Sequence, residues 1–259
     1  MRWRFLLIVS FLVAPTAHAA APDFNDFAFQ QKPGSQLPLQ AVFRDDSGRS
    51  VRLSDLLSGK PLILTLVYFH CPNLCGIVRA DLFYALGKTG MVASRDYTLI
   101  ALSIDPAETI ADAAAAKAED MSRYPAPGAA AGWHFLTGPA DALRQVADAV
   151  GFRDRFDPEL KQFLHPAGIL FATPTGTVSS YLLGVGYQPT DLRLAVTRAD
   201  RGSVAAASLP VLLLCFHYDP VTGRYTLAIM KLLRLAAAIT VVTVAGTLFL
   251  AFRRDRRGA

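Results

Sequence analysis

Cysteine and charge are both scarce in this sequence. Three of its 259 residues are cysteine and 18% are charged, whereas 52% are hydrophobic. So few cysteines exclude a small disulfide-rich scaffold, and so apolar a composition excludes an intrinsically disordered chain. The sequence therefore predicts a folded protein that buries a hydrophobic core.

Common catalytic motifs are missing as well. The sequence contains neither a nucleophile elbow nor an HExxH metalloprotease motif. Gly59-Lys60 is followed by Pro61 and does not form a phosphate-binding loop, and Gly184-Val185-Gly186 lacks the rest of the dinucleotide pattern. These absences disfavour the familiar hydrolase and nucleotide-binding classes.

The first 20 residues have the pattern of a secretory signal peptide. Arg2 and Arg4 precede a short apolar run over residues 5–13, and Ala17-His18-Ala19 supplies the small residues read before cleavage. The apolar run is too short to span a bilayer, although an uncleaved N-terminal anchor is the alternative. We expect the chain to be exported and cleaved after residue 19 or 20.

The last 30 residues contain a predicted transmembrane helix over residues 231–253. Residues 235–252 carry no charge and would reach about 27 Å as a helix, close to the thickness of a bilayer core. Four arginines follow this run, so residues 254–259 are expected to form a cytoplasmic tail. Residues 21–230 would then be a periplasmic ectodomain on a bacterial cytoplasmic membrane, anchored by a single pass.

The two ends also account for the basic net charge of +5. When the basic residues of the two ends are left out, 18 of the 26 lysines and arginines remain. When Asp255 is left out, 20 of the 21 acidic residues remain, so the ectodomain has a net charge of −2. The basic residues removed in this count are Arg2, Arg4, Lys231, Arg234, Arg253, Arg254, Arg256 and Arg257. An ectodomain without excess positive charge is not a nucleic-acid-binding surface.

Strand and helix patterns alternate along the ectodomain. We expect strands at residues 41–44, 50–53, 62–69, 97–104, 133–136, 168–172, 178–183 and 211–217. We expect helices at residues 72–87, 109–122, 140–150 and 192–198, and a loop at 124–132. This order, with a hairpin after residue 168, predicts an α/β fold with a thioredoxin-like mixed sheet flanked by helices, in addition to the C-terminal transmembrane helix; an open doubly wound sheet is the rival.

Two of the three cysteines lie where an apolar strand meets a helix. Cys71 and Cys75 are separated by three residues, and Pro72 suits the first turn of a helix. In a helix the two Cα atoms would lie roughly 6 Å apart on one face, which permits either a disulfide or two sulfurs on one soft metal. The N-terminus of that helix would favour the thiolate form of Cys71. An inert structural disulfide is the alternative, but it would close a very short loop and add little stability.

This arrangement resembles the Sco/SenC family of copper-binding, thioredoxin-like proteins. The segments that carry the resemblance are the Cys-x-x-x-Cys pair, Leu102-Ser103-Ile104-Asp105-Pro106, Trp133-His134-Phe135-Leu136-Thr137-Gly138, and His165 before the strand that leads to Pro174-Thr175-Gly176. The resemblance covers roughly residues 36–200. Leu164 stands where many members have an acidic residue.

The resemblance implies a copper site and a task. Its ligands would be Cys71, Cys75 and His165, and thiolates suit Cu(I) while an imidazole adds tolerance for Cu(II). The expected function is that of a membrane-anchored copper chaperone for the dinuclear copper site of cytochrome c oxidase subunit II, with copper or thiol donors as further partners. The alternative is a thiol-disulfide reductase that uses Cys71 and Cys75 as a redox pair to keep the oxidase cysteines reduced. Whether the protein is an enzyme or only a metallochaperone stays open.

Other candidates are weaker. His70 abuts Cys71 and could tune its thiol, cap the strand or ligate directly, whereas His134 is expected to be structural. Cys215 and His217 would share one face of a strand, either as a second metal site or, preferably, as a buried cysteine and its neighbour. A copper or redox sensor ranks last, because the short tail leaves no room for a cytoplasmic output domain.

Overall fold

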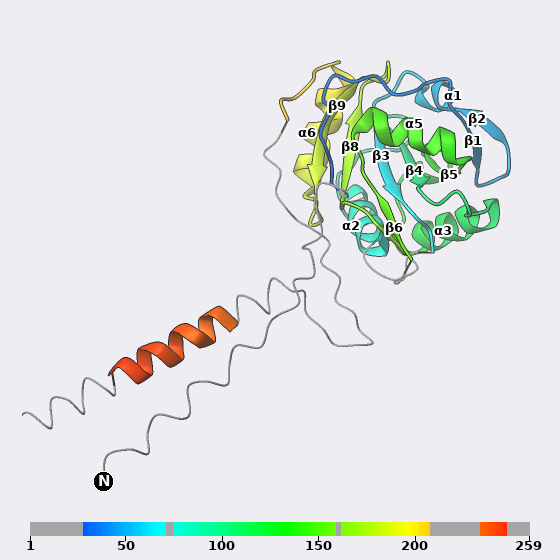
Figure 1. Ribbon diagram of the computed structural model, residues 1–259. Coiled ribbons are helices and arrows are strands. Elements are labelled where there is room, and N and C mark those ends of the chain that lie inside the picture. Colours follow the sequence, from blue (N-terminus) through cyan, green and yellow to red (C-terminus); the bar gives the residue numbers. More distant parts are fainter. Residues whose placement is uncertain (1–27, 71–74, 159–161, 208–233, 248–259) are drawn as a thin grey trace, which may run out of the picture.

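A computed structural model of the chain describes residues 28–70, 75–158, 162–207 and 234–247 (Figure 1). Its strands are β1 (Val42–Asp45), β2 (Ser50–Arg52), β3 (Leu62–Val67), β4 (Thr98–Ser103), β5 (Trp133–Thr137), β6 (Arg155–Asp157), β7 (Gln162–Leu164), β8 (Gly168–Ala172) and β9 (Val178–Leu183). Its helices are α1 (Leu53–Leu57), α2 (Cys75–Gly87), α3 (Ile110–Arg123), α4 (Ala129–Gly132), α5 (Ala140–Val150) and α6 (Pro189–Asp200).

Seven strands form one mixed sheet in the order β2-β1-β5-β4-β3-β8-β9, and β6 and β7 form a separate hairpin. The central strands β3, β4 and β5 run parallel. The outer strands are antiparallel to their neighbours, β1 against β5 on one side and β8 against β3 on the other. The mixed sheet predicted from the sequence is confirmed, and the open doubly wound sheet is excluded.

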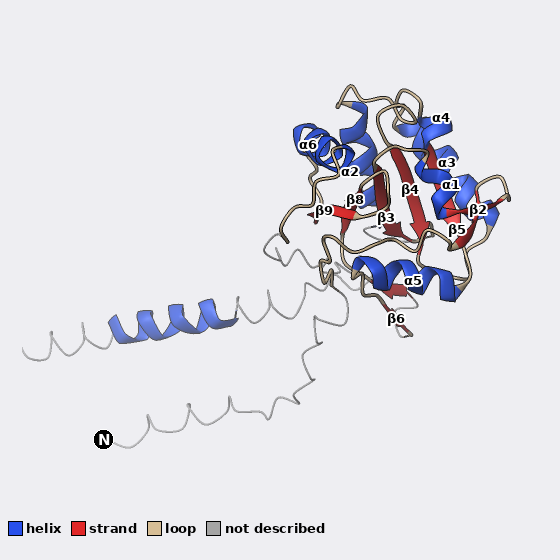
Figure 2. Cartoon of the chain, turned by 90° about the horizontal axis from the view of Figure 1, so that it is seen from above, coloured by secondary structure: helices blue, strands red, loops and turns tan. Residues whose placement is uncertain are grey.

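Helices cover both faces of this sheet (Figure 2). The core on one face joins α1 and α5 to side chains such as Leu64 and Leu102. The core on the other face joins α2, α3 and α6 to side chains such as Ile63 and Leu99. Because successive side chains of a strand point to opposite faces, β3 and β4 supply both cores, and every one of their residues is buried. This explains why both strands are continuous apolar runs in the sequence.

Several expected elements are found with the predicted bounds. Strands β8 and β9 and helix α5 coincide with the expectation, and Thr109 caps α3 by accepting a hydrogen bond from the backbone of Asp112. Gly151 ends α5 in the left-handed conformation, with φ of 67°. A Cβ at Gly151 would lie 1.9 Å from the carbonyl oxygen of Gln30, so only glycine fits this position.

Other expectations need correction. The strand predicted at residues 50–53 ends at Arg52, because Leu53 begins helix α1 and is buried there. The predicted loop at 124–132 contains the short helix α4. Helix α6 begins at Pro189 rather than residue 192, since proline occupies its first turn without losing a hydrogen bond. The hairpin of β6 and β7 was not predicted, because its strands are only three residues long.

The outer strand β9 has further backbone partners beyond β8. The backbone of residues 34–37 exchanges hydrogen bonds with residues 176–178, including Val178 N–H to Ser35 O at 2.8 Å. After α6 the chain returns to the same strand, where Ala205 N–H donates to Ser179 O at 2.8 Å. The N-terminal and C-terminal segments of the domain therefore both meet at β9.

The predicted strand at 211–217 and the signal peptide at 1–20 lie outside the described residues. Residues 234–247 form a helix within the predicted span of 231–253, and residues 248–253 are again outside the description. None of the helices in the described part of the chain combines the length and the apolar character that crossing a membrane requires.

The turn that joins β1 to β2 provides a test of stability. Burial alone would raise the pKa of Asp45, but hydrogen bonds from Ser47 and Arg49 outweigh it and lower the pKa to about 2. The carboxylate therefore stabilises the fold above the unfolded pKa of 3.8 and loses this effect as the pH falls toward 2. We expect Asp45→Asn to lower the free energy of unfolding by about 2 kcal/mol at neutral pH.

Urea denaturation of the full-length chain in detergent, measured from pH 7 down to pH 2, checks this expectation. The difference between wild type and Asp45→Asn should shrink as the pH falls. Asp200→Asn, which alters an exposed carboxylate on α6, is the matched control and should change stability little at any pH. A difference for Asp45→Asn that stays constant over this range would contradict the assignment.

Candidate functional site

The predicted thiol pair lies where the chain passes from β3 to α2. Strand β3 ends at Val67, Tyr68 to His70 continue from it, and Cys75 is the first residue of α2. Cys71 and the side chain of Cys75 lie outside the described residues. What the structure gives is the position of this segment at the carboxyl ends of the parallel strands β3 and β4, where binding sites of α/β sheets occur.

His165 follows strand β7 and precedes β8. Its ring packs edge-on against Tyr68, with the ring centroids 6.0 Å apart, and lies 5.9 Å from the ring of Phe152. Tyr68 stands three residues before Cys71. The structure thus places His165 beside the segment that leads into the thiol pair, although nearly a hundred residues separate them in sequence.

The orientation of the His165 ring follows from its neighbour in the chain. Nδ1 lies 3.0 Å from the carbonyl oxygen of Pro166. A carbonyl oxygen only accepts hydrogen bonds, so Nδ1 carries the proton in this contact. In that tautomer the lone pair that ligates a metal is on Nε2.

Aromatic side chains surround this region. Phe163 on β7 packs edge-on against Tyr68 with centroids 5.8 Å apart, and it contacts Phe156 on β6 in the same manner at 5.2 Å. The hairpin of β6 and β7 is therefore attached to the end of β3 by ring contacts. Because His165 directly follows β7, this attachment positions its ring beside Tyr68.

His70 points away from this aromatic cluster. Its Nε2 lies 3.2 Å from Asp112 Oδ1, and its Nδ1 lies 3.5 Å from Glu108 Oε1. Asp112 also caps α3, where hydrogen bonds from the backbone and hydroxyl of Thr109 lower the pKa of Asp112. These distances place the His70 ring against acidic residues at the start of α3, a contact that was not among the roles predicted for it.

Glu108 is buried directly beneath His70. Its Oε1 accepts a hydrogen bond from the His70 backbone N–H at 2.8 Å, and its Oε2 accepts one from Ser103 Oγ at 2.6 Å. Burial raises the pKa of Glu108, while the hydrogen bonds from Ser103 and from the backbone of His70 and Phe69 oppose that shift. A buried carboxyl group therefore connects the ends of β3 and β4.

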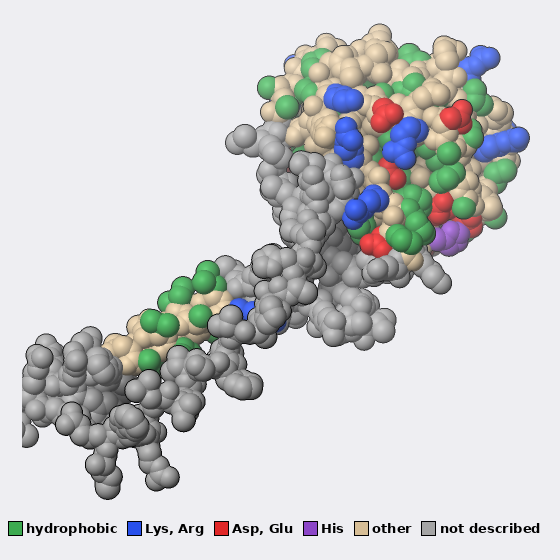
Figure 3. Space-filling model, in the orientation of Figure 1, with side chains coloured by type: hydrophobic (Ala, Val, Ile, Leu, Met, Phe, Trp, Pro, Cys, Tyr) green, Lys and Arg blue, Asp and Glu red, His purple; other side chains and the backbone are tan. Residues whose placement is uncertain are grey.

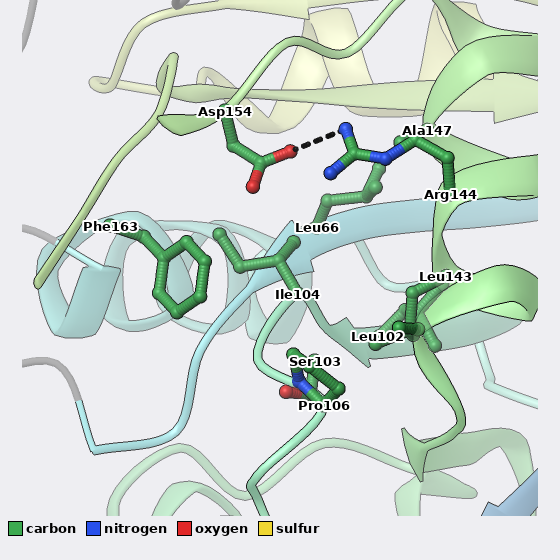
Figure 4. A pocket seen from close by; sticks show the side chains of 11 residues that line it. Leu66, Leu102, Ser103, Ile104, Pro106, Leu143, Arg144, Ala147, Asp154 and Phe163 are labelled. Carbon is green, nitrogen blue, oxygen red and sulfur yellow. Dashed lines mark ion pairs between the residues drawn. The ribbon is translucent and has the colours of Figure 1, made fainter. Parts of the chain in front are cut away.

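A cavity of about 160 Å³ lies at the same edge of the sheet (Figure 4). It is lined by Leu66, Leu102, Ser103, Ile104, Pro106, Ala140, Leu143, Arg144, Ala147, Asp154 and Phe163. Arg144 Nη1 faces Asp154 Oδ1 at 3.5 Å across it. Burial raises the pKa of Asp154, and the positive charge of Arg144 opposes that shift. The cavity is mainly apolar, and Phe163, which lines it, also contacts Tyr68.

Helix α2 is fixed to α3 by a buried ion pair. Arg79, one turn after Cys75, places Nε 2.9 Å from Asp120 Oδ2, and the two side chains are 6% and 5% exposed. The Arg79 guanidinium also lies 5.8 Å from the centre of the Phe69 ring. Burial raises the pKa of Asp120, and the charge of Arg79 opposes that shift. The pair fixes the position of the helix that carries Cys75.

The remaining candidates stay apart from this edge or are not described. His134 lies on β5, half-buried, and burial lowers its pKa, in agreement with a structural role. Cys215 and His217 lie outside the described residues. Within the described ranges, no three His, Cys, Asp or Glu side chains are placed to hold a metal ion. Of the three predicted copper ligands, only His165 has a described side chain.

The domain surface carries charges of both signs. On the face shown in Figure 3, lysine and arginine side chains lie among acidic and apolar ones.

Sequence reasoning missed the residues that support the candidate site. Glu108 precedes the expected helix start at Thr109 and looks like a solvated turn residue, and Arg79 looks like an exposed helical arginine. Both are buried because segments distant in sequence pack together: Glu108 meets the residues that follow β3, and α3 packs against α2. The sequence signal that could have pointed to Glu108 is its place one residue before a capped helix start, and that signal is weak.

Comparison with known proteins shows which molecules share this architecture. A protein from Aquifex aeolicus VF5, described as an electron transfer protein, is 25% identical to this chain, with a TM-score of 0.59, and the match covers 66% of this chain and 96% of the other. Neither a protein-family model nor a curated protein sequence matches the chain.

Two Sco/SenC structures share the fold as well. ScoI of Arabidopsis thaliana, solved with copper bound, is 19% identical with a TM-score of 0.51, and the match covers 66% of this chain and 98% of that protein. A SCO1/SenC family lipoprotein from Bacillus anthracis is 17% identical with a TM-score of 0.53, covering 66% and 99%. These structures share the thioredoxin-like fold that the Sco/SenC resemblance implied, and that fold is confirmed.

The ion pair between α2 and α3 yields a second prediction. Asp120→Ala should lower the free energy of unfolding by about 3 kcal/mol, because it leaves the Arg79 charge buried without its partner. Glu119→Ala is the matched control in the same helix: Glu119 pairs with Arg123 at 2.8 Å, but the two side chains are 54% and 59% exposed. That surface pair should contribute about 0.5 kcal/mol or less.

Urea denaturation of the full-length chain in detergent measures both variants. Equal losses for Asp120→Ala and Glu119→Ala would show that the buried pair does not fix α2 in place.

Proposed function

We propose that this chain is a copper-binding protein of the Sco/SenC type that carries copper as cargo on Cys71, Cys75 and His165. The observation that carries the proposal is the packing of the His165 ring against Tyr68. It brings the one distant histidine of the predicted ligand set to the segment that leads into the thiol pair. The shared fold with a copper-containing ScoI supports it.

The donor set fits the metal. Two thiolates favour Cu(I), and one imidazole extends the site to Cu(II), so such a site can keep copper through a change of oxidation state. The carbonyl oxygen of Pro166 accepts a hydrogen bond from Nδ1 of His165, which favours Nε2 as the ligating atom. Tyr68 and Phe152 pack against the ring and restrict its rotation.

We further propose that the copper is destined for the dinuclear copper site of cytochrome c oxidase subunit II, as the sequence resemblance implies. Copper donors and thiol reductants would be the other partners, and nucleic acid would not be one. In this role the chain binds, orients and hands on a metal ion. It requires reduced thiols both on itself and on its recipient.

A thiol-disulfide reductase is the second candidate. The feature that favours it is the spacing of Cys71 and Cys75 where the chain passes from β3 into α2. Near the N-terminus of a helix, unpaired N–H groups favour the thiolate, which is the form that attacks disulfides. The reductase would need Cys71 and Cys75 but not His165, so substitution of the histidine separates the two functions.

Membrane anchoring through residues 231–253 is part of the same proposal. In the helix at 234–247 the apolar side chains are exposed around its circumference, with Ile239, Val242 and Val244 at 59%, 71% and 51%. An apolar surface of this kind needs a partner other than water. The hydroxyls of Thr240, Thr243 and Thr247 donate to backbone carbonyls of the same helix, as polar groups in a bilayer must.

The topology follows from the flanking charges. A cleaved signal peptide at residues 1–20 would export the ectodomain of residues 21–230 to the periplasm. The arginine-rich residues 254–259 would stay in the cytoplasm. A copper site on the ectodomain then faces the compartment in which thiols oxidise readily and must be kept reduced.

Copper titration of the reduced full-length chain in detergent tests the ligand set. We expect wild type to bind one copper ion per chain and to show a thiolate-to-Cu(II) absorption in the visible range. Cys71→Ser and Cys75→Ser should abolish that absorption, because each removes a thiolate donor. His165→Ala should retain copper with an altered spectrum and lower affinity, since both sulfurs remain.

Cys215→Ser is the matched control, because it removes the cysteine that is not a predicted ligand. It should bind copper as wild type does. Absence of tight copper binding in wild type, together with a reducible Cys71–Cys75 pair, would favour the reductase. Retention of copper in all three ligand variants would contradict the ligand set and direct attention to Cys215 and His217.

Carbonate extraction of membranes that contain the full-length chain tests the anchor. Wild type should stay in the membrane pellet. Val242→Arg combined with Val244→Arg should release the protein, because each arginine near the centre of a membrane helix costs about 2.5–3.5 kcal/mol.

The control for this experiment replaces an exposed apolar residue outside the proposed membrane helix with arginine. Leu194→Arg on α6, where the side chain is 57% exposed, should leave the protein in the pellet. Release of the wild type itself would exclude a transmembrane anchor.

A further inference from the structure

A buried carboxyl group, Glu108, lies next to the predicted copper ligands without being one of them. Its side chain is 3% exposed and lies in the turn between β4 and α3. One oxygen accepts the backbone N–H of His70 at 2.8 Å, and the other accepts Ser103 Oγ at 2.6 Å. Glu108 therefore joins the residue immediately before Cys71 to the last residue of β4.

This contact begins where the pairing of the strands ends. The register of β3 and β4 runs from Leu62 to Val67, and the last backbone bond along it joins Ile104 N–H to Val67 O at 2.8 Å. Beyond that point the chain from Tyr68 to His70 leaves the ladder. The carboxyl of Glu108 then acts as the acceptor that a neighbouring strand would otherwise supply.

Glu108 is itself held in place from three sides. Ser103 Oγ, which donates to Glu108, also accepts the backbone N–H of Asp105 at 3.0 Å. On the other side, Thr109 caps α3, so the residue after Glu108 is bound into a helix start. The Glu108 backbone N–H donates to the carbonyl of Asp105 at 3.1 Å and closes the turn. The acceptor presented to His70 is therefore rigid.

Burying a carboxyl group at this position costs free energy. Burial disfavours its charged form, and an apolar side chain would fill the same volume at less cost. Hydrogen bonds from Ser103 and His70 offset part of that cost but do not by themselves require an acid. What the carboxyl does, and an apolar side chain could not, is to fix the backbone N–H of His70.

We propose that Glu108 is a positioning residue of the thiol site. It holds the backbone at His70 against the end of β4, and His70 is the residue from which the chain continues into the predicted ligand Cys71. This inference rests on the proposed copper site, and it assigns Glu108 no contact with the metal.

Two substitutions separate the position of the backbone from the charge of the acid. Glu108→Gln keeps the shape and one acceptor oxygen for His70 N–H, and its amide group can donate to Ser103 Oγ. Glu108→Ala removes both contacts. We expect the alanine variant to bind copper roughly 10- to 100-fold more weakly, the range found when groups that orient metal ligands are lost, and to shift the visible absorption. The glutamine variant should restore most of the affinity and the wild-type spectrum.

Asp45→Asn is the matched control for loss of a buried carboxylate. Asp45 is 2% exposed and holds a turn by hydrogen bonds, but it lies on β1, with β5 between that strand and β4. It should lower stability without changing copper affinity or the spectrum. All titrations use the reduced full-length chain in detergent, at a temperature where denaturation shows each variant to be folded.

A metal-free measurement keeps this test separate from the copper proposal. The reduction potential of the Cys71–Cys75 pair, measured by equilibration with thiol buffers, should shift in Glu108→Ala and return toward wild type in Glu108→Gln. If wild type binds no copper, the copper proposal fails while this measurement still decides the role of Glu108. Wild-type copper affinity and potential in a folded Glu108→Ala would overturn the inference. Equal effects of alanine and glutamine would overturn it too, because the charge rather than the backbone contact would then matter.

Discussion

The parallel pairing of β3 with β4 is the constraint on which the rest of the structure depends. Its register runs through six residue pairs, Leu62–Thr98 to Val67–Ser103, and both strands are buried throughout. Because parallel strands end at the same edge of a sheet, this register brings the segment before Cys71 and the turn that contains Glu108 to one place. The cavity beneath α5 opens at that edge too, since Leu66 and Ile104 both line it.

The second determinant of the site is the small hairpin of β6 and β7. It lies outside the main sheet and is attached through rings, above all by Phe163, which contacts Tyr68 and packs against the core that α1 and α5 cover. His165 stands at its end, so the position of this histidine depends on aromatic packing rather than on the sheet. The predicted ligands therefore depend on two parts of the fold. The buried sheet positions the segment that leads to Cys71, and the hairpin of β6 and β7 positions His165.

How far the sequence predicts the molecule depends on whether its signals are local. The bounds of β8, β9 and α5 follow from the sequence, because alternation, turn residues and a terminal glycine mark them within a few positions. Helix α1 and the hairpin of β6 and β7 are too short to show a period, and they form because tertiary packing covers them. Glu108 and Arg79 have no local mark at all, since their burial arises from chain segments far away. The cysteine motif marks a predicted site in the sequence, whereas Glu108 and Arg79 carry no such mark.

The segments that flank β9 have a consequence for how these molecules meet one another. An outer strand presents backbone donors and acceptors that a strand of another chain can pair with, which is a common route to aggregation. Here residues 34–37 pair beside the start of β9, and Ala205 donates to Ser179. The segments at the two ends of the domain thus occupy part of the outer edge of β9. When copies of this domain lie side by side, the occupied part of β9 is therefore not available to pair with a strand of another copy.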